Sequence, residues 1–374
     1  MRVAIVHDWL LGMRGGEKCL EVFCEIFPQA DLYTLLYAPD EVSAIIRRMK
    51  VHSSWLNRIP WIRRTYRYYL PLFPRIAENF DLKDYDLVLS SSHCVAKGVH
   101  ARPALHVAYI YAPMRYVWDL HEAYFKSDGS LLGRIGMAAF RRYLQSWDVR
   151  SSQRAHYFVA DSQNIAAKIR TLYGREAVVI YPPVDLERFY IRERPDSYYL
   201  VVSAFVPYKR IDIAIQAFNT LKLPLKIAGD GPLKKALQKS AGTNIEFLGW
   251  VNEPRLAQLY AGCQALVFPG EEDFGIVPLE AQASGRPVIG YEKGGLLETV
   301  IGLDGLPERY PTGLFFSAQN ASSLIAAVKL YQERQSEFRP DRIRQHAAKF
   351  SRERFKREIT EYLDLCLKQF GGTS

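Results

Sequence analysis

The stretch FPGEEDFGIVPLEAQASGRPVI, residues 268–289, decides the fold of this chain. It begins at the end of an apolar run, residues 264–268, which is typical of a short strand that a parallel sheet buries on both faces. A Pro-Gly pair ends that strand, and Pro278 suits the first residue of a helix because its missing N–H costs nothing there. The residues PVIGY then indicate the next strand. The order strand, loop, helix, strand predicts a parallel α/β sheet.

The loop and the helix N-terminus of such a unit are expected to form an anion site. Free N–H groups at the start of a helix favour negative charge, so we expect a phosphate near Phe274, Gly275 and Ile276. Glu272 lies in the loop and Glu280 in the expected first turn, where both carboxylates can accept hydrogen bonds from hydroxyl groups. A phosphate beside sugar hydroxyls describes a nucleotide sugar. For either glutamate alone, the alternative is an acid that the helix dipole favours.

The spacing of these residues resembles a known family signature. Glu272 and Glu280 enclose seven residues with Phe-Gly among them, and Gly-x-Pro-Val follows at 285–288. This pattern resembles the E-x7-E signature of retaining glycosyltransferases of the GT-B fold, family 4 (group 1), and within it a bacterial mannosyltransferase-like branch. The resemblance implies an α/β fold of two Rossmann-like, doubly wound domains facing a cleft, with a C-terminal helix that crosses back to the first domain. It also implies metal-independent chemistry without a cofactor.

Strand and helix patterns alternate along all 374 residues, which also favours two α/β domains. The polar, charged run LERFYIRERPDS, residues 186–197, is the predicted linker. We therefore expect an acceptor domain over residues 1–188, completed by a helix at 352–370, and a nucleotide-sugar donor domain over 197–350. The C-terminal helix carries an apolar stripe at helical spacing that is expected to be core.

In the second domain, Lys209 follows the first strand. A lysine at the carboxyl end of this strand can meet a pyrophosphate and stabilise the charge that grows on a leaving nucleoside diphosphate; the alternative is a solvated loop lysine. The resembling family usually has an arginine shortly after this strand, where this chain has Ala204, and Arg210 is expected to supply the missing charge. The resemblance also implies that Trp250 and Val251 border the nucleobase.

In the first domain, the strand pattern RVAIVHDW precedes a glycine-rich turn. The resemblance implies that Gly15 and Gly16 of this turn lie at the sugar and acceptor side; the alternative is an ordinary tight turn. The later motif APMRYVWD resembles one in which a histidine usually precedes the Ala-Pro pair, and Tyr111 holds that place here. Arg115 is the candidate active-site cation, with a structural ion pair as the alternative.

The net charge of +9 is concentrated in one segment. Residues 42–77 contain no Asp or Glu, but basic residues alternate there with Trp and Tyr, as at the interface of an anionic membrane. The basic members are Arg47, Arg48, Lys50, Arg58, Arg63, Arg64, Arg67 and Arg75. We expect a peripheral contact with an anionic membrane through residues 47–75. A solvated basic face over an aromatic core is the main alternative; nucleic acid is not expected as a partner, because no binding motif accompanies the charge.

No apolar run approaches the ~18 residues of a membrane helix, so we expect a cytoplasmic protein, peripheral on the inner face of the membrane. The five cysteines are scattered without metal-ligand spacing and are expected to be buried free thiols.

The predicted function is a retaining hexosyltransferase in surface polysaccharide assembly. The donor is a nucleotide sugar, with GDP-mannose as the first guess, and the acceptor is a glycan or a polyprenyl-linked saccharide. In this hypothesis Glu280 binds the ribose diol, Glu272 binds hydroxyls of the transferred sugar, and Lys209 binds the pyrophosphate. A nucleotide-sugar epimerase of the same fold is an alternative, and a non-catalytic basic protein that binds nucleic acid or nucleotide is another.

Overall fold

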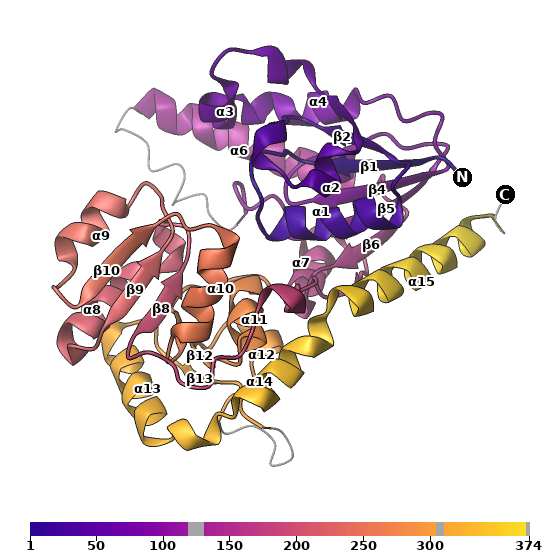
Figure 1. Cartoon of the computed structure of the whole chain (residues 1–374). Coiled ribbons are helices and arrows are strands. Elements are labelled where there is room, and N and C mark those ends of the chain that lie inside the picture. Colours follow the sequence, from indigo (N-terminus) through magenta and orange to yellow (C-terminus); the bar gives the residue numbers. More distant parts are fainter. Residues whose placement is uncertain (119–130, 304–309, 372–374) are drawn as a thin grey trace. The chain divides into compact units, whose positions relative to one another are not determined.

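The computed structural model describes residues 1–118, 131–303 and 310–371, with the side chains of 131–139 outside the description. The chain divides into two compact units, which are described separately (Figure 1). Unit 1 comprises residues 1–183 together with the C-terminal segment from Glu353, and unit 2 comprises Val184–Arg352.

Unit 1 is built on a parallel sheet of seven strands in the order β3-β2-β1-β4-β5-β6-β7. The strands are β1 (Val3–His7), β2 (Asp31–Thr34), β3 (Lys50–Ser53), β4 (Leu87–Ser92), β5 (Leu105–Ile110), β6 (Tyr157–Ala160) and β7 (Val178–Val179). Every residue of β1, β4 and β5 is buried, including the polar residues His7, Ser90–Ser92 and His106, as is usual for the inner strands of a parallel sheet. Strand β3 was not predicted, because its polar sequence KVHS fits an edge strand, where Lys50 and Ser53 stay exposed.

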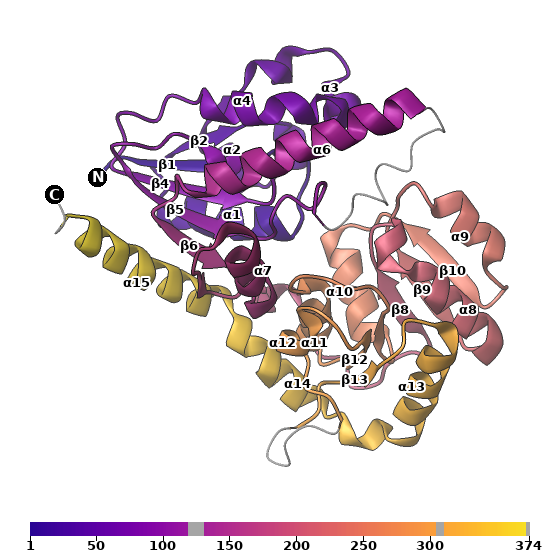
Figure 2. The same cartoon turned by 180° about the vertical axis from the view of Figure 1, so that it is seen from behind.

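Helices cover both faces of this sheet (Figures 1 and 2). On one face lie α1 (Gly15–Ile26) and α2 (Ala44–Arg47); α4 (Phe73–Glu78), α6 (Leu131–Ser152) and α7 (Gln163–Tyr173) lie on the other, with α3 (Ile62–Thr65) before α4 in the chain. Successive residues of a strand point to opposite faces of the sheet. Ile5 therefore belongs to the hydrophobic cluster that contains Phe23 of α1. Its neighbour Val6 belongs to the hydrophobic cluster on the other face, which contains Trp147 of α6.

Unit 2 has a parallel sheet of six strands in the order β10-β9-β8-β11-β12-β13. The strands are β8 (Tyr199–Val202), β9 (Leu225–Ala228), β10 (Ile245–Gly249), β11 (Leu266–Phe268), β12 (Val288–Tyr291) and β13 (Gly313–Phe316). The helices are α8 (Ile211–Leu221), α9 (Lys234–Ser240) and α13 (Ala321–Glu333) on one face, and α10 (Glu253–Gly262), α11 (Ile276–Ala283) and α12 (Leu296–Thr299) on the other, with α14 (Pro340–Ala347) against α11. The strand order reverses between β8 and β11, and ligands of such sheets bind beyond the carboxyl ends of the strands at this point.

The C-terminal helix α15 (Arg352–Gly371) completes unit 1, as predicted. Its apolar stripe is buried in the core cluster that contains Phe23 of α1; the stripe consists of Phe355, Ile359, Leu363 and Cys366. Full burial of a large apolar side chain contributes roughly 1.5 to 3 kcal/mol. The last segment of the chain is therefore a structural part of the first unit.

The predicted linker, residues 186–197, is in part packed structure. Phe189 is buried against Tyr260, with ring centroids 5.7 Å apart. Arg344 of α14 donates hydrogen bonds to the backbone oxygens of Leu186 and Phe189, at 2.9 and 2.7 Å. These contacts place the run in unit 2, which begins at Val184.

All five cysteines are buried free thiols, as predicted. Among the described helices, none is both long enough and apolar enough to cross a membrane.

Candidate functional site

The loop between β11 and α11 differs in one respect from the prediction. Helix α11 begins at Ile276, because Gly275 adopts φ +100°, a left-handed conformation that favours glycine, at the N-cap position. Pro278 is the third helical residue, where its missing N–H still costs no hydrogen bond. The expectation that Pro278 starts the helix is therefore wrong, and Glu280 lies in the second turn rather than the first.

Two glycines after β12 hold the loop that carries Glu272. The backbone of Glu272 forms a parallel bridge with Gly294, and Gly295 N–H donates to the Glu272 carbonyl at 2.8 Å. A β-carbon on Gly295 would lie 2.3 Å from the Asp273 carbonyl oxygen and from Phe274 Cα, far inside van der Waals contact. Glycine at position 295 is thus required for the loop to lie where it does.

Lys209 and Glu272 meet at the carboxyl ends of β8 and β11. Lys209 closes a short 3-10 turn, Pro207–Lys209, after β8, and its ammonium forms an ion pair with the Glu272 carboxylate. Gly270 permits this approach, since a β-carbon there would lie 3.0 Å from Lys209 Cα. Both side chains are largely but not fully buried. The structure thus brings together two residues 63 positions apart in the sequence that were predicted separately.

Glu280 is buried inside unit 2. Its Oε2 accepts a hydrogen bond from the hydroxyl of Tyr260 on α10, at 2.8 Å. Burial, and then the Glu280 carboxylate, raise the pKa of Tyr260 well above its ordinary value, so this hydroxyl remains a donor. Tyr260 was not predicted as a site residue, because its place in the helix pattern of residues 253–262 is equally typical of core.

The guanidinium of Arg210 forms hydrogen bonds with side chains of unit 2. It has φ +49°, and its guanidinium donates to Asp212 at 3.1 to 3.3 Å and to Gln319 at 3.2 Å. Gln319 in turn donates to the Pro269 carbonyl at 3.0 Å, where the β11–α11 loop begins. In this structure Arg210 therefore supports the position of the loop.

The other predicted donor-side residues lie at the same edge of the sheet. Trp250 and Val251 follow β10, and the Trp250 side chain is 78% exposed, which is rare for an indole that has only a packing role. Phe274 is buried, with its ring 6.1 Å from that of Phe350. Phe274 is thus part of the support of the loop.

In unit 1, Gly15 and Gly16 are the first two residues of α1 rather than a turn before it. The hydroxyl of Tyr111 donates to the Gly16 carbonyl at 3.1 Å and lies 2.8 Å from Ser91 Oγ. Burial raises the pKa of Tyr111 well above its ordinary value. Arg115 lies in the turn that follows β5, half-buried.

Two polar residues of unit 1 were missed as site residues. Asp8 follows β1 and is buried, and its carboxylate faces His93, which follows β4. The sequence carried a signal, since Asp8 stands directly after the strand VAIVH and His93 directly after the strand LVLSSS.

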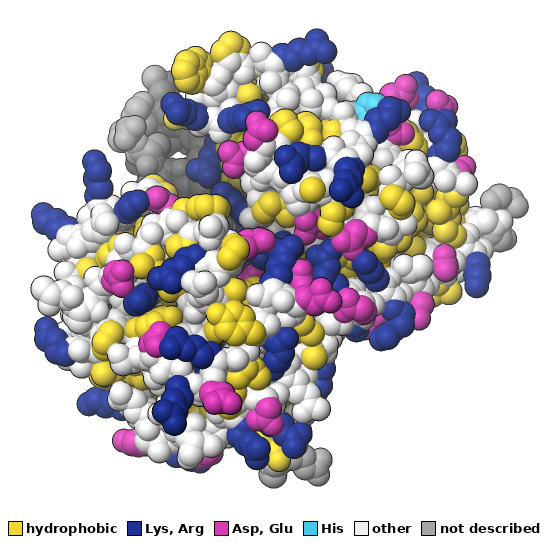
Figure 3. Space-filling view, in the orientation of Figure 1, with side chains coloured by type: hydrophobic (Ala, Val, Ile, Leu, Met, Phe, Trp, Pro, Cys, Tyr) yellow, Lys and Arg dark blue, Asp and Glu magenta, His cyan; other side chains and the backbone are white. Residues whose placement is uncertain are grey.

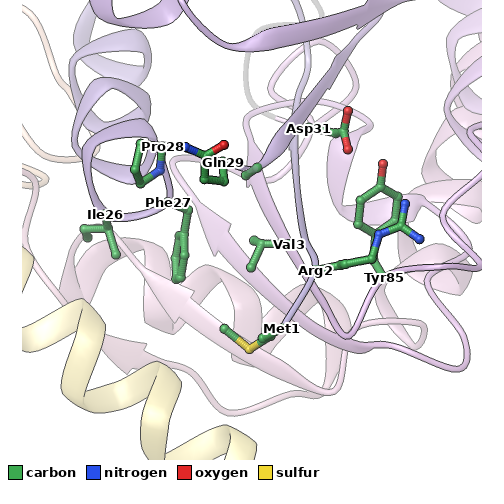
Figure 4. A pocket seen from close by; sticks show the side chains of 10 residues that line it. Met1, Arg2, Val3, Ile26, Phe27, Pro28, Gln29, Asp31 and Tyr85 are labelled. Atoms are coloured by element: carbon green, nitrogen blue, oxygen red, sulfur yellow. The ribbon is translucent and has the colours of Figure 1, made fainter.

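A cavity of about 320 Å³ opens at the opposite edge of unit 1 (Figure 4). Its lining comes from the start of β1, the end of α1 and the start of β2, with Arg2 beside Tyr85. Because ligands of parallel sheets bind at the carboxyl ends of the strands, this cavity is not part of the candidate site.

Two family profiles match the chain. Residues 15–188 match the family described as Glycosyltransferase Family 4, and residues 186–350 match the family described as Glycosyl transferases group 1. Together the two profiles extend over both units.

Individual relatives agree with these profiles. The chain is 39% identical over 136 residues to the uncharacterized glycosyltransferase MJ1178 of Methanocaldococcus jannaschii, across 35% of this chain and 38% of that protein. It is 30% identical over 154 residues to O-antigen chain mannosyltransferase C of Escherichia coli, across 36% of this chain and 42% of the relative. The chain thus spans less than half the length of each of these relatives.

A solved structure of Anabaena HepE with UDP and glucose resembles the chain with a TM-score of 0.70 and 17% identity, over 97% of this chain and 99% of that one. This likeness shows that the predicted GT-B fold is correct.

Proposed function

The chain belongs to the family 4, or group 1, glycosyltransferases, and we propose on this basis that it transfers a hexose from a nucleotide sugar to a saccharide hydroxyl. The observation that carries the proposal is the pair of Lys209 and Glu272 beside the N-terminus of α11. A cation, a carboxylate and free helix N–H groups at one point match the pyrophosphate and the sugar of such a donor.

The ion pair has a definite part in this mechanism. Without donor, Glu272 is a counter-charge of Lys209. When the pyrophosphate of the donor takes over that role, the carboxylate is released to accept hydrogen bonds from sugar hydroxyls. As the bond between the hexose and the phosphate breaks, negative charge grows on the leaving nucleoside diphosphate, and Lys209 stabilises it together with the helix N–H groups.

Glu280 is assigned to the ribose diol. Tyr260 donates to one of its oxygens, and this fixes the orientation of the carboxylate. Trp250 and Val251 are assigned to the nucleobase side. Arg115, Gly15, Gly16 and Tyr111 remain the candidates of unit 1 for the sugar and acceptor side.

GDP-mannose is the proposed donor, and a glycan or polyprenyl-linked saccharide in surface polysaccharide assembly is the proposed acceptor. Support comes from the Escherichia coli relative, whose name is O-antigen chain mannosyltransferase C. HepE was solved with UDP and glucose, so a uridine nucleotide belongs in the same test.

We expect calorimetry of the full chain with GDP-, UDP- and ADP-sugars to reveal one preferred nucleotide. Lys209→Ala and Glu280→Ala should each lower the affinity for that nucleotide sugar about tenfold or more, since a hydrogen bond to a charged group contributes about 1.5 to 3 kcal/mol. Lys234→Ala, which removes a lysine paired with Asp230 on the surface, should leave the affinity unchanged. If no nucleotide binds, the transferase proposal fails. If the donor binds and is converted to another sugar nucleotide without acceptor, the epimerase alternative takes its place.

We further propose that unit 1 contacts an anionic membrane through residues 47–75, on the cytoplasmic side. All eight basic residues of this segment are exposed, and so are Trp55, Trp61 and Tyr68. The guanidinium of Arg64 lies 5.7 Å from the Trp61 ring, and that of Arg67 lies 5.7 Å from the Tyr66 ring. Hydrophobic and basic side chains lie side by side over the region of α3 (Figure 3). This combination suits lipid headgroups of negative charge.

Flotation with liposomes that contain phosphatidylserine tests the contact. The triple variant of Arg63, Arg64 and Arg67 to Glu is expected to lose most of the binding, because each basic residue near the surface contributes about 1 kcal/mol. A matched variant, with Lys222, Lys235 and Lys239 of unit 2 changed to Glu, has the same net charge and should float like the native chain. Equal flotation of the two variants would contradict the proposal.

A further inference from the structure

We propose that Gln282 of unit 2 is a positioning residue for hexose transfer, because it holds the short helix that fixes the loop of Glu272. This inference rests on the proposed function of Glu272 and adds to it a residue that no motif of the sequence marked. Gln282 lies on α11, two positions after Glu280, and its side chain is fully buried. It therefore acts through other residues.

Helix α12 depends on contacts outside itself. It has four residues, Leu296–Thr299, and a single helical turn has too few internal hydrogen bonds to be stable alone. Directly before it stand Gly294 and Gly295, whose backbone groups pair with the backbone of Glu272. The position of α12 therefore decides the position of Glu272.

Two side chains hold the other end of α12. The Thr299 carbonyl, at the end of the helix, accepts a hydrogen bond from Gln282 Nε2 at 2.9 Å and lies 3.2 Å from His346 Nε2 on α14. A carbonyl at the end of a helix has no partner within the helix and needs one from elsewhere. The contact of Gln282 is the shorter of the two. It joins the helix that carries Glu280 to the helix that fixes Glu272.

The amide of Gln282 serves as a donor. Its Nε2 also donates to the Pro278 carbonyl at 3.3 Å, so both partners are acceptors and the nitrogen must face them. The amide oxygen is buried and has no hydrogen-bond partner among the residues that the structure describes. A buried acceptor without a partner destabilises a fold, and an apolar side chain of similar size would avoid this cost. The hydrogen bond to Thr299 explains why a polar side chain stands here.

Helix α11 has separate supports. Tyr260 donates to Glu280 Oε2 at 2.8 Å, and the guanidinium of Arg344 donates to the Ala283 carbonyl at the end of α11. Neither contact involves Gln282. Loss of its amide donor is therefore expected to release α12 and the loop that α12 fixes, whereas Glu280 stays in place for the nucleotide.

Gln282→Met retains the length of the side chain and removes the donor. It should lower kcat for hexose transfer about 10- to 10²-fold, since a misplacement of ~1 Å can cost about 10²-fold in rate. Its affinity for the nucleoside diphosphate, measured by calorimetry, should match that of the native chain. Hydrogen exchange of the Gly295 amide, which donates to the Glu272 carbonyl, should become faster. Native turnover would overturn the inference, and so would a loss of nucleotide affinity as large as the loss of kcat.

Asn244→Leu is the matched control. The Asn244 amide also donates to two backbone carbonyls of unit 2, those of Phe218 and Leu223, at 3.0 and 2.7 Å. Asn244 stands directly before β10, at the edge of the sheet opposite to the carboxyl ends of the strands. Both variants are expected to lower the thermal midpoint, but Gln282→Met alone should lower kcat. If Asn244→Leu lowers kcat equally, lost stability explains the effect and the inference fails.

Gln282→Glu tests the donor itself. Burial among carbonyl oxygens favours the protonated, neutral form of the new acid, which can donate one hydrogen bond to Thr299, whereas the carboxylate cannot. The kcat of Gln282→Glu should therefore exceed that of Gln282→Met, by a ratio that is largest at low pH. This ratio isolates the acid, because His346 is present in both variants. Equal turnover of the two variants at every pH would show that the donor has no role.

The proposed function fails or stands separately from this inference. If the native chain binds no nucleotide and transfers no hexose, the proposed function is overturned. If the native chain transfers hexose and Gln282→Met does so at the native rate, the proposed function stands and the role of Gln282 is overturned.

Discussion

Glu272→Gln is expected to lower kcat for hexose transfer by about 10²- to 10³-fold, the range measured when one preorganised polar group is lost from a charge-stabilising site. The amide retains the shape of the side chain but removes the negative charge beside Lys209. It also replaces half of the acceptor capacity for sugar hydroxyls by a donor. Folding should be preserved, because the loop is fixed by the backbone of Glu272 and not by its carboxylate.

Release of nucleoside diphosphate from the donor identified by calorimetry measures this effect. The matched control is Glu271→Gln, one residue earlier, where an exposed carboxylate pairs with Lys293 at 3.1 Å. The control should keep native turnover, and both variants should share the native circular dichroism spectrum and thermal midpoint. Near-native turnover of Glu272→Gln would remove this residue from the mechanism.

Lys97→Met is expected to destabilise unit 1 by about 3 to 5 kcal/mol, the usual cost of removing one partner of a buried ion pair. Lys97 is 1% exposed, and its Nζ lies 2.7 Å from Oδ1 of the fully buried Asp148 on α6. The other oxygen of Asp148 accepts from Trp118 Nε1 and from the Tyr173 hydroxyl, each at 2.8 Å. Loss of the ammonium leaves a buried carboxylate without its counter-charge.

Hydrogen exchange of the β4 and β5 amides measures the effect within unit 1, which avoids the assumption that a chain of two units unfolds in one step. Lys50→Met is the matched control. The Lys50 ammonium lies 2.8 Å from Asp31, but the side chain is 74% exposed, so its removal should lower the stability by at most about 1 kcal/mol. Lys97→Met combined with Asp148→Leu should recover much of the stability, since no unpaired charge remains. Equal protection in the two lysine variants would show that the buried pair does not carry this energy.

The fold could be predicted well where the pattern is local. Mainly apolar runs marked β1, β5 and the first half of β4, and the spacing of Phe355 and Ile359 marked the buried stripe of α15. The edge strand β3 was not visible, because an edge strand needs no apolar face. The start of α11 was misplaced because Pro278 is compatible with several positions of a first turn, and the conformation of Gly275 decides among them.

The candidate site was predictable residue by residue but not as an arrangement. Lys209 and Glu272 each carried a signal, yet their ion pair depends on the order of β8 and β11 in the sheet and on the space left by Gly270. The same holds for Asp8 and His93, which lie 85 residues apart and meet only because β1 and β4 are neighbours. Tyr260 was missed because helix periodicity does not distinguish a buried tyrosine that binds a carboxylate from one that fills space.

The return of α15 to unit 1 has a consequence for synthesis on the ribosome. The Phe355 ring packs against Phe23 and Tyr109, at centroid distances of 5.6 and 5.7 Å, but it is synthesised 246 residues after Tyr109. All of unit 2, Val184–Arg352, lies between Tyr109 and Phe355 in the chain and is therefore synthesised before this ring. Until α15 has been synthesised, a nascent unit 1 leaves this apolar face uncovered, and such a surface is what chaperones bind in incomplete chains.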